Sequence, residues 1–168
     1  VSRLGVPLLL VSKIERDNGS GGYFSTTYSY QGALLHREGK GFLGFENISS
    51  FDDQSGLQND VWYSDLDTTY FCFKKIHTYI RLGINGSIVN FNENICSIKN
   101  WGLKNIYLYT SESKSYEQEV INPPISIYRY TKTVTNDVDD YGNALQIEVS
   151  KGVSWENPSF KETSHNTY

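Results

Sequence analysis

Short runs in which apolar and polar residues alternate follow one another along the chain, and turn-forming residues separate them. Alternation with a period of two is typical of strands that bury one face. The pattern predicts a hairpin with strands over residues 8–14 and 23–30 and a turn over 17–22. No window of a dozen residues places apolar side chains at helical spacing. The chain is therefore predicted to be all-β and antiparallel, with under about a tenth of its residues in helix.

Turn signals divide the rest of the chain into further hairpins. Strands are predicted within 34–51 and over 68–82, 88–91, 103–109, 116–121, 125–135 and 144–150. Asn85-Gly86 is the strongest short hairpin signal, and residues 52–56 are predicted to be an exposed turn. Asn122-Pro123-Pro124 interrupts the strand pattern, because proline donates no hydrogen bond to a sheet. The prolines predict two regions, residues 1–121 and 122–168.

Composition favours strands and argues against nucleic acid as a partner. Aromatic residues make up 14% of the chain, 13 of them tyrosines, and such rings suit a pleated, half-buried surface. The net charge of -4 provides no basic field, so a nucleic-acid partner is not expected. The chain contains no Met, so Val1 is not expected to be a translation start. We therefore expect a slice of a larger protein, and no leader or transmembrane run is found in the sequence.

Glycines and tyrosines form the most specific motifs. Tyr28 and Tyr30 share one sheet face, and the same spacing recurs at residues 107 and 109 and at 128 and 130, which indicates a loosely repeated hairpin. A GKGFLGF string covers residues 39–45, and Gly44 inside a strand indicates that a backbone or ring packs close to it. By their parity, Phe42 and Phe45 are predicted on opposite faces, at least one of them largely buried.

These motifs resemble those of the Rhs/YD-repeat family, in particular the region shared with the B components of insecticidal Tc toxin complexes. Family members have a Y-x-Y strand, a GRGFLGF stretch, a D-x-x-G-N turn and a T-x-Y strand ending. Lys40 stands where the family usually has Arg, and residues 60–116 show no family pattern. The residues that carry the resemblance as a structural motif are Tyr28, Tyr30, Gly39, Gly41, Phe42, Leu43, Gly44, Phe45, Asp140, Gly142 and Asn143.

The resemblance implies a ribbon of β-hairpins that spirals into a hollow shell around a C-terminal effector region. Repeat units of this kind bury their aromatic faces only against their neighbours. Such proteins are secreted or displayed at a cell surface. The implied partners are the remainder of the same polypeptide or the enclosed effector, and the implied role is structural, with no catalytic residue and no cofactor.

Residues 137–148 also match a calcium loop of the EF-hand type in part. Acids occupy its first, third and twelfth positions, Asp137, Asp139 and Glu148, and Gly142 occupies the sixth. The fifth position is Tyr141, which offers no short oxygen ligand, and both flanks are predicted strands where the motif needs helices. An acidic hairpin turn is therefore favoured, with Gly142 or Asn143 at positive φ, and no metal site is predicted.

No arrangement of residues indicates catalysis. Cys72 and His77 differ by an odd number, so one regular strand points them to opposite faces. Cys72 and Cys96 either form one bridge or remain two buried thiols, and the thiols are favoured. Carboxylates that meet in space would allow glycoside chemistry, but nothing in the sequence brings such pairs together; the candidates are Asp52, Asp53, Asp65 and Asp67.

The alternative function is a carbohydrate- or protein-binding β surface module. Exposed tryptophans would form its stacking platform, although burial in a core is favoured for each of Trp62, Trp101 and Trp155. A binding module should present a row of aromatic side chains to solvent. A shell segment should instead present unpaired sheet edges.

Overall fold

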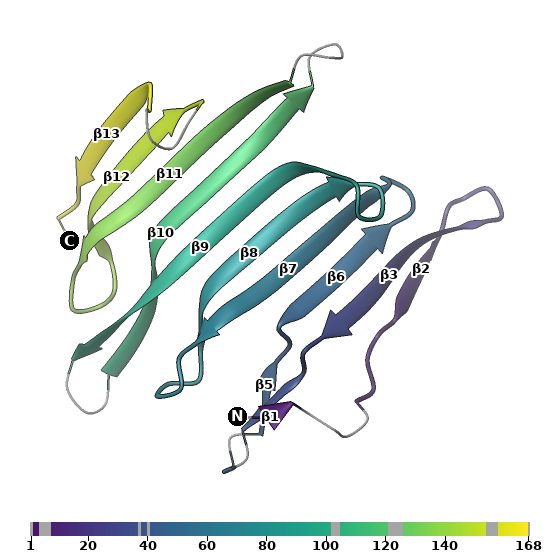
Figure 1. Cartoon of the computed structure of the whole chain (residues 1–168), viewed down its shortest axis with the longest axis horizontal. Coiled ribbons are helices and arrows are strands. Elements are labelled where there is room, and N and C mark those ends of the chain that lie inside the picture. The colour runs from purple at the N-terminus through teal and green to yellow at the C-terminus, as the bar shows by residue number, and fades with distance from the viewer. Residues whose placement is uncertain are drawn as a thin grey trace. The chain divides into compact units, whose positions relative to one another are not determined.

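A computed structural model describes residues 2–3, 8–36, 38–39, 41–101, 105–120, 126–153 and 158–167. All regular structure in this part of the chain is strand, which confirms the all-β prediction (Figure 1). No helix suited in length and apolarity to crossing a membrane occurs among these residues. The strands are β1 Ser2–Arg3, β2 Lys13–Asp17, β3 Tyr23–Gln31, β4 Leu34–His36, β5 Gly41–Gly44, β6 Asn47–Asp52, β7 Leu57–Leu66, β8 Phe73–Leu82, β9 Ser87–Trp101, β10 Asn105–Val120, β11 Ser126–Val138, β12 Ala144–Gly152 and β13 Phe160–His165.

The strands fall into two compact units. The first unit consists of Val1–Phe73 and His77–Val89, and the second of Lys74–Ile76 and Asn90–Tyr168. Strands β8 and β9 therefore contribute residues to both. The joint predicted at residues 122–124 lies outside the described residues.

The first unit is a sheet in the order β8, β7, β6, β3, β2, together with a small sheet in the order β1, β4, β5 (purple to teal in Figure 1). Tyr28 on β3 lies opposite Ser50 on β6, and Ser49 lies opposite Asp60 on β7. The predicted hairpin at residues 17–22 is confirmed, although β2 begins at Lys13 instead of residue 8. The predicted turn after β6 is also confirmed, and it leads directly into β7.

Strand β7 was not predicted, and its burial pattern explains why. Two of its residues, Gln58 and Asp60, are polar and buried, whereas Trp62 is 43% exposed. The strand therefore lacks the apolar-inside alternation from which strands are recognised. Its buried positions are occupied by side chains that bond to one another.

The second unit is a sheet in the order β13, β12, β11, β10, β9 (green to yellow in Figure 1). The two short strands predicted over 103–109 and 116–121 belong to one strand, β10, of 16 residues. A register shift between Thr110 and Glu112 marks a bulge, where the Ser111 hydroxyl donates to the Ile95 carbonyl at 3.0 Å. The prediction failed because the polar run at 110–115 carries ion pairs in place of an apolar face.

Buried apolar side chains are scarce in both units. Among the described residues only Leu34 and Val138 are buried hydrophobics, at 8% and 3% exposure. Large apolar residues such as Leu9, Ile84 and Tyr141 are exposed. Each described sheet is therefore a layer that supplies little core of its own, whereas sheets in stable domains pack a hydrophobic face on another layer.

Candidate functional site

A network of polar side chains lies on one face of the first unit. We call Ser49, Gln58, Asp60 and Arg81 the polar cluster. One carboxylate oxygen of Asp60, Oδ1, accepts hydrogen bonds from the Ser49 hydroxyl and from Gln58 Nε2, the latter at 2.7 Å. The other oxygen, Oδ2, accepts from Arg81 Nε at 3.0 Å. Because Ser49 and Asp60 are directly opposite in the register, sheet pairing itself builds the centre of the cluster.

The turn between β8 and β9 folds against this cluster. The backbone N–H of Asn85 donates to Gln58 Oε1 at 2.8 Å, and Arg81 Nη1 donates to the Gly86 carbonyl at 3.4 Å. The predicted Asn85-Gly86 turn is thereby confirmed, with Asn85 at a φ of 55°. Local hairpin chemistry and the polar cluster thus fix each other's geometry.

Asp60 is held ionised by its neighbours. Burial on its own raises the pKa of Asp60. Hydrogen bonds from Ser49, Gln58 and Arg81, together with the positive charge of Arg81, outweigh burial and bring the pKa of Asp60 below its ordinary value. The site therefore contains an ionised carboxylate paired with a guanidinium.

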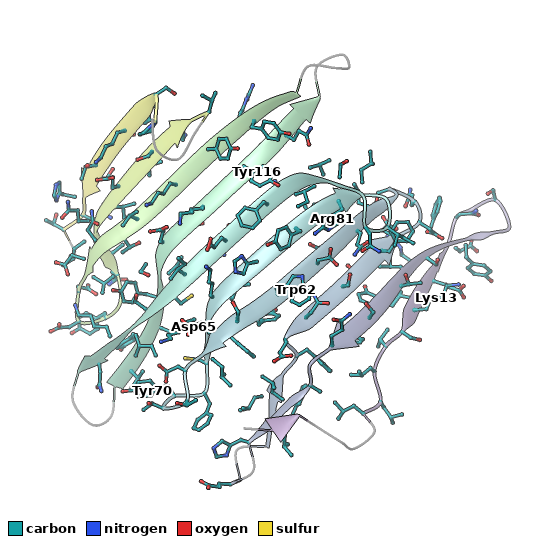
Figure 2. All side chains as sticks on the ribbon, in the orientation of Figure 1. Lys13, Trp62, Asp65, Tyr70, Arg81 and Tyr116 are labelled. Atoms are coloured by element: carbon teal, nitrogen blue, oxygen red, sulfur yellow. The ribbon has the colours of Figure 1, made fainter. Side chains whose placement is uncertain are left out.

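Two clefts open beside Trp62, one of about 410 Å³ over the polar cluster and one of about 430 Å³ over His77 and Tyr79. Trp62 on β7 and Arg81 on β8 line both (Figure 2). The guanidinium carbon of Arg81 lies 5.3 Å from the centroid of the Tyr79 ring. The expectation that Trp62 belongs to a core is wrong, because it is largely open to solvent although it shares its sheet face with the buried residues Gln58 and Asp60. The side chains of Trp101 and Trp155 lie outside the description.

The Tyr and Gly motif residues of the first unit lie around a different set of contacts. Tyr30 packs on Phe45 with ring centroids 4.9 Å apart, and its hydroxyl donates to the Val11 carbonyl at 3.0 Å. The predicted close packing at Gly44 is confirmed, since a Cβ there would lie 3.7 Å from the Phe73 ring. Tyr28 is half-buried on the same strand, Leu43 is half-buried on β5, and Gly39 and Gly41 both have positive φ.

The prediction for Phe42 and Phe45 is wrong. Their ring centroids are 5.1 Å apart, so the two side chains meet instead of covering opposite faces. Gly44 has a φ of 125° and β5 ends there, which breaks the regular alternation that the parity argument assumed. Phe42 is 45% exposed and Phe45 is half-buried.

The hairpin turn at residues 139–143 has the predicted left-handed glycine, with Gly142 at a φ of 86°. Its organising residue is Asp139, which was not among the predicted motif residues. The Asp139 carboxylate accepts from the backbone N–H groups of Tyr141 and Asn143 at 2.8 Å each and from Asn143 Nδ2 at 2.9 Å. Asp140 is exposed. The carboxylate that shapes the turn thus stands one residue before the family motif.

The acids of the calcium-loop alternative are engaged separately. Besides the turn bonds of Asp139, Glu148 pairs with Lys161 at 3.0 Å, and Asp137 accepts from the backbone N–H of Val138 at 2.9 Å. No group of three or more metal-binding side chains occurs in the part of the chain that the structure describes. These contacts support the reading as an acidic turn.

The candidate catalytic groups have structural neighbours. The His36 and Phe71 rings lie edge to face with centroids 4.2 Å apart. Cys72 and Cys96 are half-buried thiols that no disulfide joins. Asp53 accepts from the backbone and hydroxyl of Ser25 at 2.6 and 2.8 Å. Asp52 and Asp67 accept hydrogen bonds from the turns that follow them, and Asp65 has a φ of 55°.

Aromatic side chains gather on one face of the second unit. Tyr116 on β10 lies opposite Phe91 on β9 and Tyr130 on β11, with ring centroids at 5.4 and 5.8 Å. Tyr128 adds a fourth ring at 6.2 Å from Tyr116. We call these four residues the aromatic cluster; the tyrosine repeat in the sequence pointed to two of its members, Tyr128 and Tyr130.

Comparison with known proteins gives a fold relationship. No protein-family model and no curated protein matches the sequence. The crystal structure of TcdB2-TccC3 is similar with a TM-score of 0.65 and 12% identity, over 82% of this chain and 10% of that chain. The Tc holotoxin pore of Photorhabdus luminescens, with a mutation in TccC3, is similar with a TM-score of 0.58 and 12% identity, over 89% of this chain and 10% of that chain.

The chain therefore has a Tc-toxin-related fold. A third structure, TcdB2-TccC3 without its hypervariable C-terminal region, is similar with a TM-score of 0.57 and 12% identity over 77% of this chain. The chain spans about a tenth of the length of these proteins. At such identities the likeness shows the fold alone.

Proposed function

We propose that the chain is a non-catalytic wall segment of an exported Rhs/YD-repeat protein of the toxin-complex type, whose β wall encloses or presents an effector region. The observation that carries the proposal is the scarcity of core. With two buried apolar side chains among the described residues, the sheets need further protein to cover them. A wall made of consecutive hairpin repeats supplies that cover from neighbouring turns of the same polypeptide.

The outer strands of the two sheets support the same proposal. All residues of β2 in the first unit and of β13 in the second are exposed. Each of these strands stands at the end of its sheet order and has one neighbouring strand, so its other edge is open to a further strand. A wall segment meets the next hairpin of its own chain at such edges.

The similar structures favour the toxin-complex class. They include TcdB2-TccC3 with and without a hypervariable C-terminal region, and in each the likeness covers about a tenth of the longer chain. A segment that corresponds to about a tenth of the longer chain fits one part of a long wall. The Y-x-Y, GxGFLGF and DxxGN residues supply its turns and ring contacts in this proposal, and its partners are the rest of the polypeptide and the effector.

Hydrogen exchange tests the wall role. The amides of β2 and β13 should exchange quickly in the isolated chain and become protected in a longer polypeptide that includes the neighbouring sequence on both sides. Amides of β10, which is paired on both sides, serve as the internal control and should be protected in both proteins. Rapid exchange of both edge strands in the longer polypeptide would contradict the proposal.

A further inference from the structure

On β7, Trp62 shares its sheet face with the polar residues Gln58 and Asp60. It is 43% exposed and lies between the cleft over the polar cluster and the cleft over Tyr79. An indole is the largest apolar surface that a side chain offers, and holding it in water forgoes the free energy of its burial. Because Trp62 lines two adjacent clefts, its ring is placed to contact a bound molecule.

Aromatic side chains continue from Trp62 onto the next strand. The rings of His77 and Tyr79 lie in nearly parallel planes, 5° apart, with centroids separated by 6.3 Å. Both rings and Trp62 line the same cleft. Together with Trp62, these rings offer apolar contact to a ligand with weakly polar C–H faces.

The charges of the two clefts favour an uncharged ligand. Asp60 and Arg81 are the only acidic or basic side chains, histidine aside, among the described residues that line them, and the two form an ion pair at 3.0 Å. An anionic or cationic ligand would therefore meet a neutralised site. Nucleic acid, whose binding depends on unpaired basic charge, does not fit.

Hydrogen-bonding groups surround the aromatic surface. Thr27, Ser29 and Gln31 are exposed on β3 at alternate positions of one face, and each lines the cleft over the polar cluster. The Arg81 guanidinium has five N–H groups, and its bonds to Asp60 and Gly86 engage two of them. Hydroxyl, amide and guanidinium groups around an aromatic platform match a ligand that carries many hydroxyls.

A peptide fits this face less well than a sugar. Extended peptides bind sheets by adding a strand at an edge, where backbone groups are free. The clefts lie instead over β3, β6, β7 and β8, which are neighbours in the sheet, and both β6 and β7 have a neighbouring strand on each side. The ligand must therefore be recognised through side chains alone.

We propose that this face of the first unit binds a neutral oligosaccharide, with one sugar ring stacked on Trp62 and the next in contact with the edges of the Tyr79 and His77 rings. Arg81, Gln31 and Ser29 are the hydrogen-bonding side chains for the sugar hydroxyls. Asp60 acts as a positioning residue, because it holds the guanidinium of Arg81. The proposal goes beyond the wall role and does not depend on it.

The test measures binding of the full chain to neutral hexasaccharides of glucose, xylose and N-acetylglucosamine by isothermal titration calorimetry. At least one of them should bind. Trp62→Ala should weaken that affinity by about tenfold or more, since loss of a stacked ring contact is worth on the order of 1.4 kcal/mol. Trp62→Phe, which keeps a ring at this position, should retain part of the affinity.

Controls separate loss of the site from loss of the fold. Tyr23→Ala removes a ring that is 68% exposed and lines neither cleft, and it should bind as the unchanged chain does. Circular dichroism and thermal melting of all variants check the fold, and Gln31→Ala provides a second site variant with a smaller expected loss. The proposal is overturned if none of the hexasaccharides binds, or if folded Trp62→Ala binds as tightly as the unchanged chain.

Discussion

The two units use the same architecture but place their charges differently. In the first unit, Asp60 is 7% exposed and bonds to three side chains beneath the open clefts. In the second unit, charged side chains run across the strands as a ladder of ion pairs at 2.5 to 3.4 Å. Their side chains are between 12% and 37% exposed, compared with 9% for Asp60 and 26% for Arg81.

Because of this difference, the free energy of unfolding should depend on different kinds of residue in the two units. Removing one partner from a buried network leaves the others desolvated and unpaired, whereas a solvated partner regains water. The second unit compensates with the aromatic cluster, whose stacked rings remove apolar surface from water. The largest single-residue effects are therefore expected at the polar cluster in one unit and at Tyr116 in the other.

The largest effect is expected for Asp60→Asn. This change keeps the shape of the side chain but removes the charge that pairs with Arg81, and it turns one acceptor oxygen into a donor. We expect the free energy of unfolding to fall by about 2–3 kcal/mol at pH 7, measured by urea denaturation. Glu15→Gln, which breaks the exposed pair of Lys13 and Glu15, is the control and should leave the stability unchanged.

Acid should erase the effect of Asp60→Asn. Because the pKa of Asp60 in the folded state lies below its unfolded value, ionised Asp60 stabilises the fold above that value. The contribution is lost as the pH falls below about 4 and through the folded pKa. The difference between the two proteins should accordingly be constant from pH 5 to 7 and shrink in more acidic buffer. A difference that persists undiminished at pH 2.5 would assign the effect to packing instead of charge.

Tyr116→Ala should be the most damaging change in the second unit. Tyr116 contacts Phe91, Tyr128 and Tyr130, so its removal deprives three rings of their common neighbour. The side chain is half-buried, and we expect a loss of about 2 kcal/mol in the free energy of unfolding, less than for a fully buried ring. Tyr141→Ala, at a ring that is 78% exposed, should change it by less than about 0.5 kcal/mol.

Gly142→Val tests the turn at residues 139–143. Gly142 has a φ of 86°, and a Cβ there would lie 3.4 Å from Tyr107 Cδ1, so both backbone and space disfavour a branched side chain. The free energy of unfolding should fall by roughly 1–2 kcal/mol. Gly142→Asn should cost less, because asparagine enters the left-handed region more easily. Equal losses for the two variants would mean that crowding against Tyr107 dominates.

The smallest effect is expected for Glu112→Gln in the ion-pair ladder. Burial raises the pKa of Glu112. The hydrogen bond and charge of Lys114, together with the charge of Lys132, lower the pKa by more than burial raises it, so the pKa lies below its ordinary value. The loss should be about 0.5 kcal/mol in dilute buffer and should disappear in 1 M salt. A loss as large as that of Asp60→Asn would remove the distinction between the two units.

The sequence determined the all-β class, most of the hairpin turns and the left-handed glycine at position 142. These features are local: a turn needs particular residues at fixed offsets, and period-two alternation is visible in any strand with one apolar face. Asn85-Gly86 and the turn at 17–22 were predicted for this reason. The tyrosine spacing likewise identified rings that meet in the aromatic cluster.

Only the tertiary structure decided where polar residues are buried and which rings meet. In the sequence alone, Asp60 has the character of a surface residue. Pairing of β6 with β7 places it opposite Ser49, Arg81 on β8 donates to it, and Asn85 in the turn after β8 donates to its neighbour Gln58. Phe42 and Phe45 meet because the backbone at Gly44 leaves the strand conformation, which no parity count reveals. Residues far apart in sequence create these environments, and their register is set by the whole sheet and not by any one strand.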